Sequence, residues 1–375
     1  MFYPCNFDPA GVLFRLSEIV IHLRLHPSEN LRLTQHPRPE YHLANMNLKR
    51  HKISIWVAGA LLLGSLAADS SAADRLRVAY SALNASQSYL WVAQDMGFYR
   101  KYGLDVDLLY INSGSMNIAA LLGGSIQIAG GGPVSIEARL RGIKLLILAS
   151  PLPFLAANLV TSPEIKAVSD MKGKTGGISR FGSSTDQGFR YLFRKAGLSV
   201  ESDLKLLQLG GDASRLAAMK IGKIQYTFLG AAATEQAKTL GYRVLATAQQ
   251  MAIPFPWTSV VVDESWLVAN REVPYRYLKS LTESIWFMKH HRAESERIIG
   301  RYMKTSDPQL GRMEYEFVTS LLPDYAVPTL EGIRLILENF GKEYPDAPRR
   351  DPKEFVDGSF IERLKSERFV ENLKL

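Results

Sequence analysis

The chain has little cysteine, and it has few histidines beyond its first 51 residues. Its one cysteine, Cys5, precedes every recognisable structural pattern, so no disulfide can form within the chain. The histidines beyond residue 51 are His290 and His291, which would point in different directions from a helix. These shortages argue against a disulfide scaffold, a cysteine nucleophile and a Cys/His metal site. We therefore expect no metal and no cofactor.

Sequence motifs of nucleotide binding and of hydrolysis are also absent. The run Gly130–Gly132 is followed by Ser135, where a dinucleotide-binding loop needs its third glycine, and it lacks the Gly-Lys-Ser/Thr ending of a phosphate-binding loop. No G-x-S-x-G turn, which would expose a nucleophilic serine, occurs in the chain. The sequence therefore shows no signal of an enzyme, and we expect no catalytic residue.

The chain carries an excess of positive charge but no basic patch in its sequence. Its 45 Lys and Arg residues exceed its 37 Asp and Glu residues, for a net charge of +8. The basic residues are interspersed with acidic ones, and no Lys/Arg block lies beside stacking aromatics. This pattern is typical of a solvated mixed surface, so a nucleic-acid partner is not expected.

Residues 46–73 have the three parts of a secretory signal. A charged start at 49–52 precedes an apolar run at 53–67, and small residues follow at 71–73. The apolar run is shorter than the roughly 20 residues that span a bilayer, and no cysteine follows it for lipid attachment. The pattern predicts export to the periplasm, with a retained anchor as the alternative.

Residues 1–45 have no obvious role ahead of an export signal. They are rich in Pro and His and show no sustained periodicity. Our hypothesis is that translation starts at Met46 and that residues 1–45 are a non-native leader. Peptides from upstream of Met46 in the native protein would contradict this hypothesis.

The stretch 76–110 reads as a strand, a polar loop, a helix and a second strand. Leu76, Val78 and Tyr80 alternate with more polar neighbours, as in a strand. Ser86 is expected to cap the helix, and Gly103 to end it in a left-handed conformation. Such a unit is a parallel crossover, whose ligands bind beyond the carboxyl ends of the strands. This places a ligand over residues 81–88.

The same alternation of strands and helices continues along the chain and predicts an α/β protein. Further strands are expected at 126–129, 144–150, 174–179, 204–209, 226–229, 243–246 and 259–262. Helices are expected at 117–122, 133–141, 185–195, 212–220 and 231–240, and mainly helices follow residue 273.

Four stretches in this order resemble a known family. They are WVAQDMGFYRKYGLDVDL (91–108), SGSMNIAALLGGSIQIAGGGPVS (113–135), VSDMKGKTGGISRFGSSTDQGFRYLFRKAGL (168–198) and MKIGKI (219–224). Together they resemble the solute-binding proteins of ABC transporters in the nitrate/sulfonate/taurine group, which includes binders of thiamine-pyrimidine precursors. The resemblance covers roughly residues 75–303.

The resemblance implies a type II periplasmic-binding-protein fold. Two α/β lobes would be joined by a two-segment hinge, with C-terminal helices. Residues 74–160 would form the first part of lobe 1, residues 161–250 lobe 2, and residues 251–375 the return to lobe 1 with those helices. It also implies a small-molecule ligand and, as partners, an ABC permease and its ATPase. The chain would be a monomer that meets the membrane only through the permease.

The candidate ligand-binding residues lie in loops where strands end and helices begin. Gly, Ser and Asn in such loops let a ligand approach the backbone N–H groups at helix starts. The candidates are Ser81, Asn84, Ser113, Gly114, Ser115, Gly131, Gly132, Pro133, Arg180, Gly182, Ser183, Ser184, Gly230 and Trp257. The alternative interpretation is that these residues are only caps and turns.

Two of these candidates bear on the ligand's chemistry. Arg180 could pair with a sulfonate, carboxylate or phosphate, or could be a solvated surface residue. Trp257 could form one wall of the cleft or belong to the core. Several relatives carry an acidic residue where this chain has Leu229–Ala231, and its lack disfavours a cationic ligand.

These observations favour a receptor for a small sulfonate-, taurine- or nitrate-like anion. One alternative is a binder of a pyrimidine or another aromatic heterocycle. The other is an enzyme or sensor that reuses the fold, because a fold does not fix a function.

Overall fold

The computed structural model describes residues 73–373, which belong to one compact unit of the chain, Ser70–Leu375. The expected leader and almost all of the expected signal lie outside the described residues. Within 73–373, no helix combines the length and the apolar composition needed to cross a membrane.

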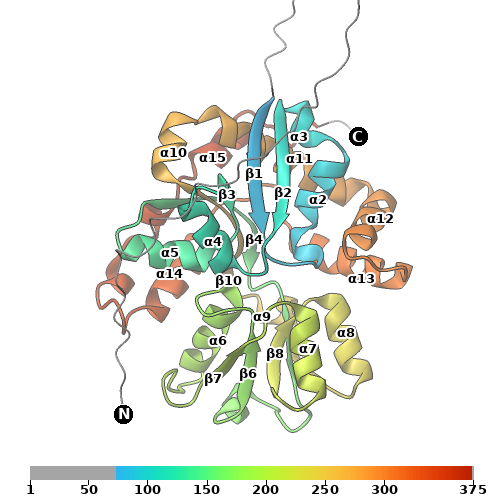
Figure 1. Cartoon of the computed structure of the whole chain (residues 1–375), viewed down its shortest axis with the longest axis vertical. Coiled ribbons are helices and arrows are strands. Elements are labelled where there is room, and N and C mark those ends of the chain that lie inside the picture. Colours follow the sequence, from blue (N-terminus) through green and yellow to red (C-terminus); the bar gives the residue numbers. More distant parts are fainter. Residues whose placement is uncertain (1–72, 374–375) are drawn as a thin grey trace, which may run out of the picture. The chain divides into compact units, whose positions relative to one another are not determined.

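The strands form two five-stranded sheets, one in each lobe (Figure 1). The strands are β1 (Asp74–Tyr80), β2 (Leu104–Tyr110), β3 (Ile128–Ala129), β4 (Leu145–Phe154), β5 (Asn158–Thr161), β6 (Thr175–Ile178), β7 (Lys205–Gln208), β8 (Tyr226–Leu229), β9 (Arg243–Ala246) and β10 (Pro254–Asp263). The sheet orders are β2-β1-β3-β10-β4 and β7-β6-β8-β5-β9. The expected crossover is confirmed, since β1 pairs in parallel with both β2 and β3.

Helices cover the sheets and form the C-terminal part of the chain (Figure 1). The α-helices are α2 (Ser88–Asp95), α3 (Phe98–Lys101), α4 (Gly114–Leu122), α5 (Gly132–Leu140), α6 (Ser184–Lys195), α7 (Asp212–Lys220), α8 (Ala231–Thr239), α9 (Ala248–Met251), α10 (Glu264–Ala269), α11 (Glu272–His290), α12 (Arg292–Tyr302), α13 (Pro308–Thr319), α14 (Leu330–Asn339) and α15 (Ser359–Ser366). Short 3₁₀ helices are η2 (Ala85–Gln87), η3 (Val168–Met171), η4 (Ala347–Arg349) and η5 (Pro352–Phe355).

The core of the first lobe lies on both faces of its sheet. In β4, Leu148 packs in a cluster with Trp91 of α2 and Tyr277 of α11. The neighbouring Ile147 faces a second cluster, which contains Ile333 of α14. A strand buried on both faces needs the continuous apolar sequence that β4 has. The second cluster continues into the other lobe, where Phe189 of α6 stacks on Phe228 of β8 with ring centroids 4.3 Å apart.

Two segments connect the lobes. The chain leaves the first sheet at the end of β4 and enters the second at β5, and it returns through α9 into β10. β4 and β10 pair antiparallel as far as Phe154 and Pro254, so both strands are longer than the sequence pattern predicted. The lobe boundary expected at residue 160 falls within β5, which pairs with β8 and β9 of the second sheet.

The C-terminal helices contact both lobes. α11 packs against α2 and α3, as expected for a helix that covers the first lobe. α13 packs against α8, and α14 packs against α6, both in the second lobe. Arg194 of α6 pairs with Glu338 of α14 at 3.1 Å. These helices therefore bridge the two lobes beside the connecting segments.

The start of α2 differs from the expectation. Ser86 lies inside η2 and does not cap the helix. Asn84 caps η2, since its side-chain oxygen accepts from the backbone N–H of Ser86 at 3.1 Å. The N-cap residue of α2 is Gln87, which makes no side-chain cap hydrogen bond. The expected left-handed conformation of Gly103 is confirmed by its φ of +69°. In the next crossover, Ser113 caps α4.

Candidate functional site

A cavity of about 70 Å³ lies between the two lobes. The loops after β1, β2 and β3 line it from the first lobe, and the loops after β6 and β7 line it from the second. Trp257 of β10 adds a wall next to the connecting segments. The ends of strands from both sheets thus meet at one site, as is general for ligand sites in α/β sheets.

The predicted residues divide into those that line this cavity and those that do not. The cavity is lined by Ser81, Asn84, Ser113, Gly114, Gly131, Ser183, Ser184 and Trp257. Ser115 and Gly182 line a neighbouring groove, and Gly132 and Pro133 are buried in the first turn of α5. Arg180 is exposed and lines neither space. Gly230 lies behind the lining, where its N–H donates to Asp212 at 2.8 Å.

The first lobe presents two helix starts side by side. Gly131 has a φ of +128°, and a Cβ there would lie 2.8 Å from the carbonyl oxygen of Gly114. Only glycine permits this close approach between the start of α4 and the loop that leads into α5. Helix starts carry unpaired N–H groups and a partial positive charge, so together they suit a negatively charged group.

Ser113 adds a donor at the same place. Its Oγ accepts from the backbone N–H of Ser115 at 3.1 Å, which caps α4. The residue is 1% exposed. Because the oxygen serves as an acceptor for the cap, the hydroxyl hydrogen remains available to donate to a ligand.

Hydroxyl groups of the second lobe are already engaged with one another. Ser179 donates to Ser183 at 2.8 Å, and Ser183 donates to the carbonyl of Arg180 at 2.6 Å. Ser184 donates to the carbonyl of Trp257 at 3.1 Å, which links the second lobe to β10. These contacts fix the loop after β6 in place before a ligand arrives.

An ion pair forms the charged part of the cavity wall. Arg215 is 4% exposed, and its Nη2 donates to Asp212 at 2.6 Å and to the carbonyl of Phe228 at 3.0 Å. Its Nε is buried and has no partner within the part of the chain that the structure describes. Burial lowers the pKa of Arg215, and Asp212 opposes this shift.

Asp212 also joins the lobes. Its Oδ2 accepts from the N–H of Gly230 at 2.8 Å and from the side-chain amide of Asn84 at 3.2 Å. Asn84 belongs to the first lobe, whereas Asp212 and Gly230 belong to the second. The carboxylate is thus held by a cation, a backbone donor and an amide, which offset its charge.

Sequence reasoning missed this ion pair. The available signal was the Gly210–Gly211 loop followed by Asp212 at the start of a helix, with Arg215 one turn later. Arg180 is the charged residue of the candidate loop after β6, but it does not line the cavity. The arginine that reaches the cavity comes from the next crossover. Other lining residues, which were not among the named candidates, are Ala82, Ser86, Gln87, Asn112, Ser179, Thr185 and Gly211. Ala82, Ser86 and Gln87 nevertheless lie in the stretch 81–88, over which the sequence placed a ligand.

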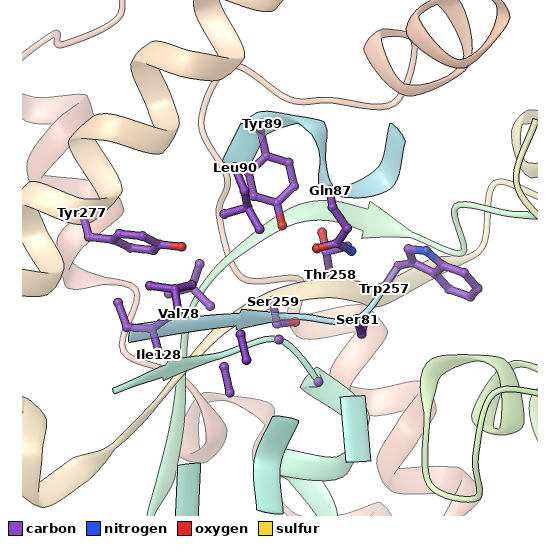
Figure 2. A pocket seen from close by; sticks show the side chains of 15 residues that line it. Val78, Ser81, Gln87, Tyr89, Leu90, Ile128, Trp257, Thr258, Ser259 and Tyr277 are labelled. Carbon is purple, nitrogen blue, oxygen red and sulfur yellow. The ribbon is translucent and has the colours of Figure 1, made fainter. Parts of the chain in front are cut away.

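A smaller inner pocket continues from the cavity into the first lobe (Figure 2). The two spaces share Ser81, Gln87, Gly131 and Trp257. The inner pocket measures about 20 Å³, which is room for about one water molecule. Figure 2 shows the Tyr89 hydroxyl pointing toward Thr258 and Gln87, while Trp257 points away from this group. Burial raises the pKa of Tyr89, so its hydroxyl stays protonated.

A third space of about 200 Å³ adjoins the cavity on the outside. It shares Asn84, Asn112 and Asp212 with the cavity and adds Leu83 and Tyr110. Both added side chains are substantially exposed, at 47% and 41%. This space could hold a less polar extension of a ligand.

The described residues offer no cluster suited to a metal. Across 73–373, no group of three or more His, Cys, Asp or Glu side chains is placed to hold a metal ion. Besides Ala82 and Trp257, the cavity lining consists of hydroxyls, amides, glycine backbone and the Asp212–Arg215 pair. Such a set can bind a polar solute through hydrogen bonds.

The model of the NMT1/THI5-like family matches residues 84–295, more than half of the chain. The chain belongs to this family. The matched range includes the cavity lining from Asn84 to Trp257 and ends before α13.

Known proteins of similar sequence and structure agree with this assignment. YtlA of Bacillus subtilis (strain 168), provisionally named a binding protein, is 23% identical over 296 residues, covering 71% of this chain and 88% of its own. The alkanesulfonate-binding protein SsuA from Xanthomonas axonopodis pv. citri, bound to MOPS, has a TM-score of 0.61 at 19% identity, covering 76% and 97%. The periplasmic nitrate-binding protein NrtA from Synechocystis PCC 6803 has a TM-score of 0.62 at 14% identity, covering 78% and 88%.

These similarities confirm the expected fold. The two lobes with their five-stranded sheets form a periplasmic-binding-protein fold. At identities under 20%, the structural similarity establishes the fold but not the ligand.

Proposed function

We propose that this protein is the solute receptor of an ABC importer and captures a small anion between its lobes. The observation that carries the proposal is the cavity itself, which loops from both lobes line. A ligand that contacts both lobes favours the closed arrangement, and closure about two connecting segments is a common response to such a ligand.

The size of the cavity supports a compact solute. At about 70 Å³ it holds about five water-sized groups, since one such group needs roughly 10–15 Å³. A nitrate or the head group of a sulfonate fits this space. A substituted pyrimidine would have to extend into the outer space beside Leu83 and Tyr110.

The donors in the cavity support a negatively charged solute. The start of α4 and the loop that leads into α5 meet there, and neither helix has an acidic residue in its first turn. Ser113 can add a hydroxyl donor. Asp212 and Arg215 offset each other's charge, so the attraction would come mainly from oriented donors. Two of the similar structures are described as sulfonate- and nitrate-binding proteins.

The same similarities support the proposed location and partners. Related structures include a periplasmic sulphonate-binding protein of Escherichia coli and a ligand-binding component of an ABC-type import system from Staphylococcus aureus. Together with the signal predicted at 46–73, they support a periplasmic protein that delivers its ligand to a permease and its ATPase. We propose that no bond is made or broken at the site.

A thermal-shift screen of the full chain tests this function. The panel contains nitrate, taurine, alkanesulfonates, aromatic carboxylates and pyrimidine precursors. A ligand at 100 times its Kd should stabilise the protein by about 2.7 kcal/mol. We expect an anion to raise the Tm, and this shift to shrink in Ser113→Ala but not in Ser125→Ala. Ser125 is an exposed serine of the same lobe.

Two results would contradict the proposal. If only neutral heterocycles raise the Tm, the heterocycle alternative replaces the anion. If a stabilising compound is converted on incubation, the protein is an enzyme that has reused the fold.

A further inference from the structure

A buried carboxyl group lies behind the cavity, outside the segment that the family model matches. Glu314 of α13 is 1% exposed. Its Oε1 accepts from the backbone N–H of Ala232 at 2.7 Å, and its Oε2 accepts from the backbone N–H of Ala85 at 3.0 Å. One side chain thus satisfies two backbone donors that are far apart in the sequence.

The two donors belong to different lobes. Ala85 begins η2, directly after the loop that follows β1 of the first lobe. Ala232 lies in the first turn of α8 in the second lobe. Both are helix starts, where backbone N–H groups lack partners within the helix. Glu314 therefore occupies the position between them that a bound anion could take.

The same two segments carry the ligand site. Asn84 and Ser86, which flank Ala85, line the cavity. α8 follows Gly230, which donates to Asp212, and Asp212 in turn accepts from Asn84. Glu314 and Asp212 therefore each accept hydrogen bonds from both lobes. Glu314 does so behind the cavity, and Asp212 does so in the cavity wall.

We propose that Glu314 is a positioning residue of the ligand site, which holds η2 and α8 together and so sets how closely the lobes approach over the cavity. The inference rests on the proposed receptor function, because the approach of the lobes can be controlled only if the cleft opens and closes. Glu314 does not touch the cavity, so it acts through the segments it holds.

Few charged groups lie near Glu314. Of the neighbouring ionised groups, Asp212 is the one whose charge acts on it. η2 carries no ionisable side chain, and Arg312 of α13 is exposed. The charged groups on α8 and α12 are paired elsewhere: Lys238 with Glu235, Arg292 with Glu296 and Glu316, Arg297 with Glu294, and Arg301 with Asp95.

These surroundings make the tie sensitive to pH. Burial raises the pKa of Glu314 from 4.5 to about 7, against the opposing effect of its two backbone donors. If opening the lobes lets water reach the carboxyl group, its pKa returns toward 4.5, and closure then takes up a proton. Protonation of Glu314 therefore stabilises the closed form. This stabilisation is complete below about pH 4.5 and is lost as the pH rises through about 7. The ratio of closed to open forms would change by up to about tenfold per pH unit in this window.

Distance measurement between the lobes tests the proposal without any ligand. Spin labels are attached to Val268→Cys and Ile221→Cys in the full chain carrying Cys5→Ala, since these positions are 73% and 77% exposed on different lobes. We expect a shorter mean distance at about pH 5 than at about pH 8. Glu314→Gln should abolish this difference. The control Glu316→Gln, on the exposed face of the same helix, should retain it.

Three outcomes would overturn the proposal. The first is a distance in the wild-type chain that does not change with pH. The second is a Glu314→Gln variant that keeps the wild-type pH response. The third is a lower Tm in this variant with unchanged distances, which would make Glu314 only structural.

If Glu314→Gln does not fold, a second variant, Glu314→Asp, can test the proposal. Glu314→Asp keeps the titrating group but is too short to reach both amides, so it should give longer distances at both pH values. The distance measurement uses no ligand. A negative result there would contradict the role of Glu314, whereas a thermal-shift screen without any stabilising compound would concern the receptor function.

Discussion

The two lobes share a topology, with equivalent strands in the same places. In the orders β2-β1-β3-β10-β4 and β7-β6-β8-β5-β9, the first three strands are parallel and the fourth runs antiparallel to its neighbours. Each fourth strand belongs to, or directly follows, a segment that connects the lobes. The same scaffold therefore brings two sets of helix starts to one cavity.

The lobes differ in what occupies those helix starts. In the second lobe, Asp186 accepts from the N–H of Gly182 at 2.8 Å at the start of α6, Asp212 begins α7, and Glu314 accepts from α8. In the first lobe, α4 and α5 have no acidic residue in their first turns. The second lobe thus neutralises its helix starts with the protein's own carboxylates, whereas α4 and α5 of the first lobe have no such carboxylate, as the proposed anion site requires.

The largest expected effect comes from breaking the charge pair of the second lobe. Arg215→Met leaves Asp212 without its cation and removes the donor to Phe228. Breaking a buried pair costs about 3–5 kcal/mol, and we expect the lower end because Asp212 is partly exposed. Urea unfolding measures the loss of stability.

The double variant Arg215→Met with Asp212→Asn tests whether the charge pair is the cause. It should recover part of the loss, because the unpaired charge is gone. Lys220→Met, at the exposed end of the same helix, should change stability by no more than about 0.5 kcal/mol. Equal losses in the single and double variants would show that packing, and not charge, makes Arg215 important.

A smaller effect is expected from separating the helix starts of the first lobe. Gly131→Ala must adopt a φ of +128° and must move the Gly114 carbonyl, which lies 2.8 Å from the new Cβ. The strain should cost about 1–3 kcal/mol, and the anion found in the screen should no longer raise the Tm.

The matched control is Gly124→Ala. This glycine of the same lobe has a φ of +69° but no atom within 4 Å of an added Cβ. It should lose about 1 kcal/mol and keep its ligand response. If Gly131→Ala also keeps the ligand response, the helix starts of the first lobe do not bind the anion.

Most of the fold could be predicted because its determinants are local. The alternation at Leu76, Val78 and Tyr80 and the apolar run 144–150 predicted strands that the structure contains. The predicted strand stops at residue 150, whereas β4 extends to Phe154 and contains Pro151 and Pro153. β4 continues through both prolines because it is an edge strand, where a missing N–H donor is tolerated.

The candidate site could be predicted only in part. Glycine and serine after a strand are a local signal, and it identified Ser113, Gly131 and Ser183, which line the cavity. Glu314 carries no such signal, because its partners lie 229 and 82 residues away in the sequence. Its role depends on where α13 packs, and tertiary packing of this kind leaves no pattern in the surrounding residues.

The smallest expected effect concerns Arg180, for which the sequence left open a role as the anion's partner or as a solvated surface residue. Its side chain is exposed and lies outside the cavity lining, so Arg180→Ala should change stability by no more than about 0.5 kcal/mol. The Kd of the anion found in the screen, measured by calorimetry, should stay within about twofold, because a solvated charge contributes little. A larger loss of affinity would mean that Arg180 reaches the ligand when it is bound. The second lobe would then supply positive charge as well, and the division of roles between the lobes would be wrong.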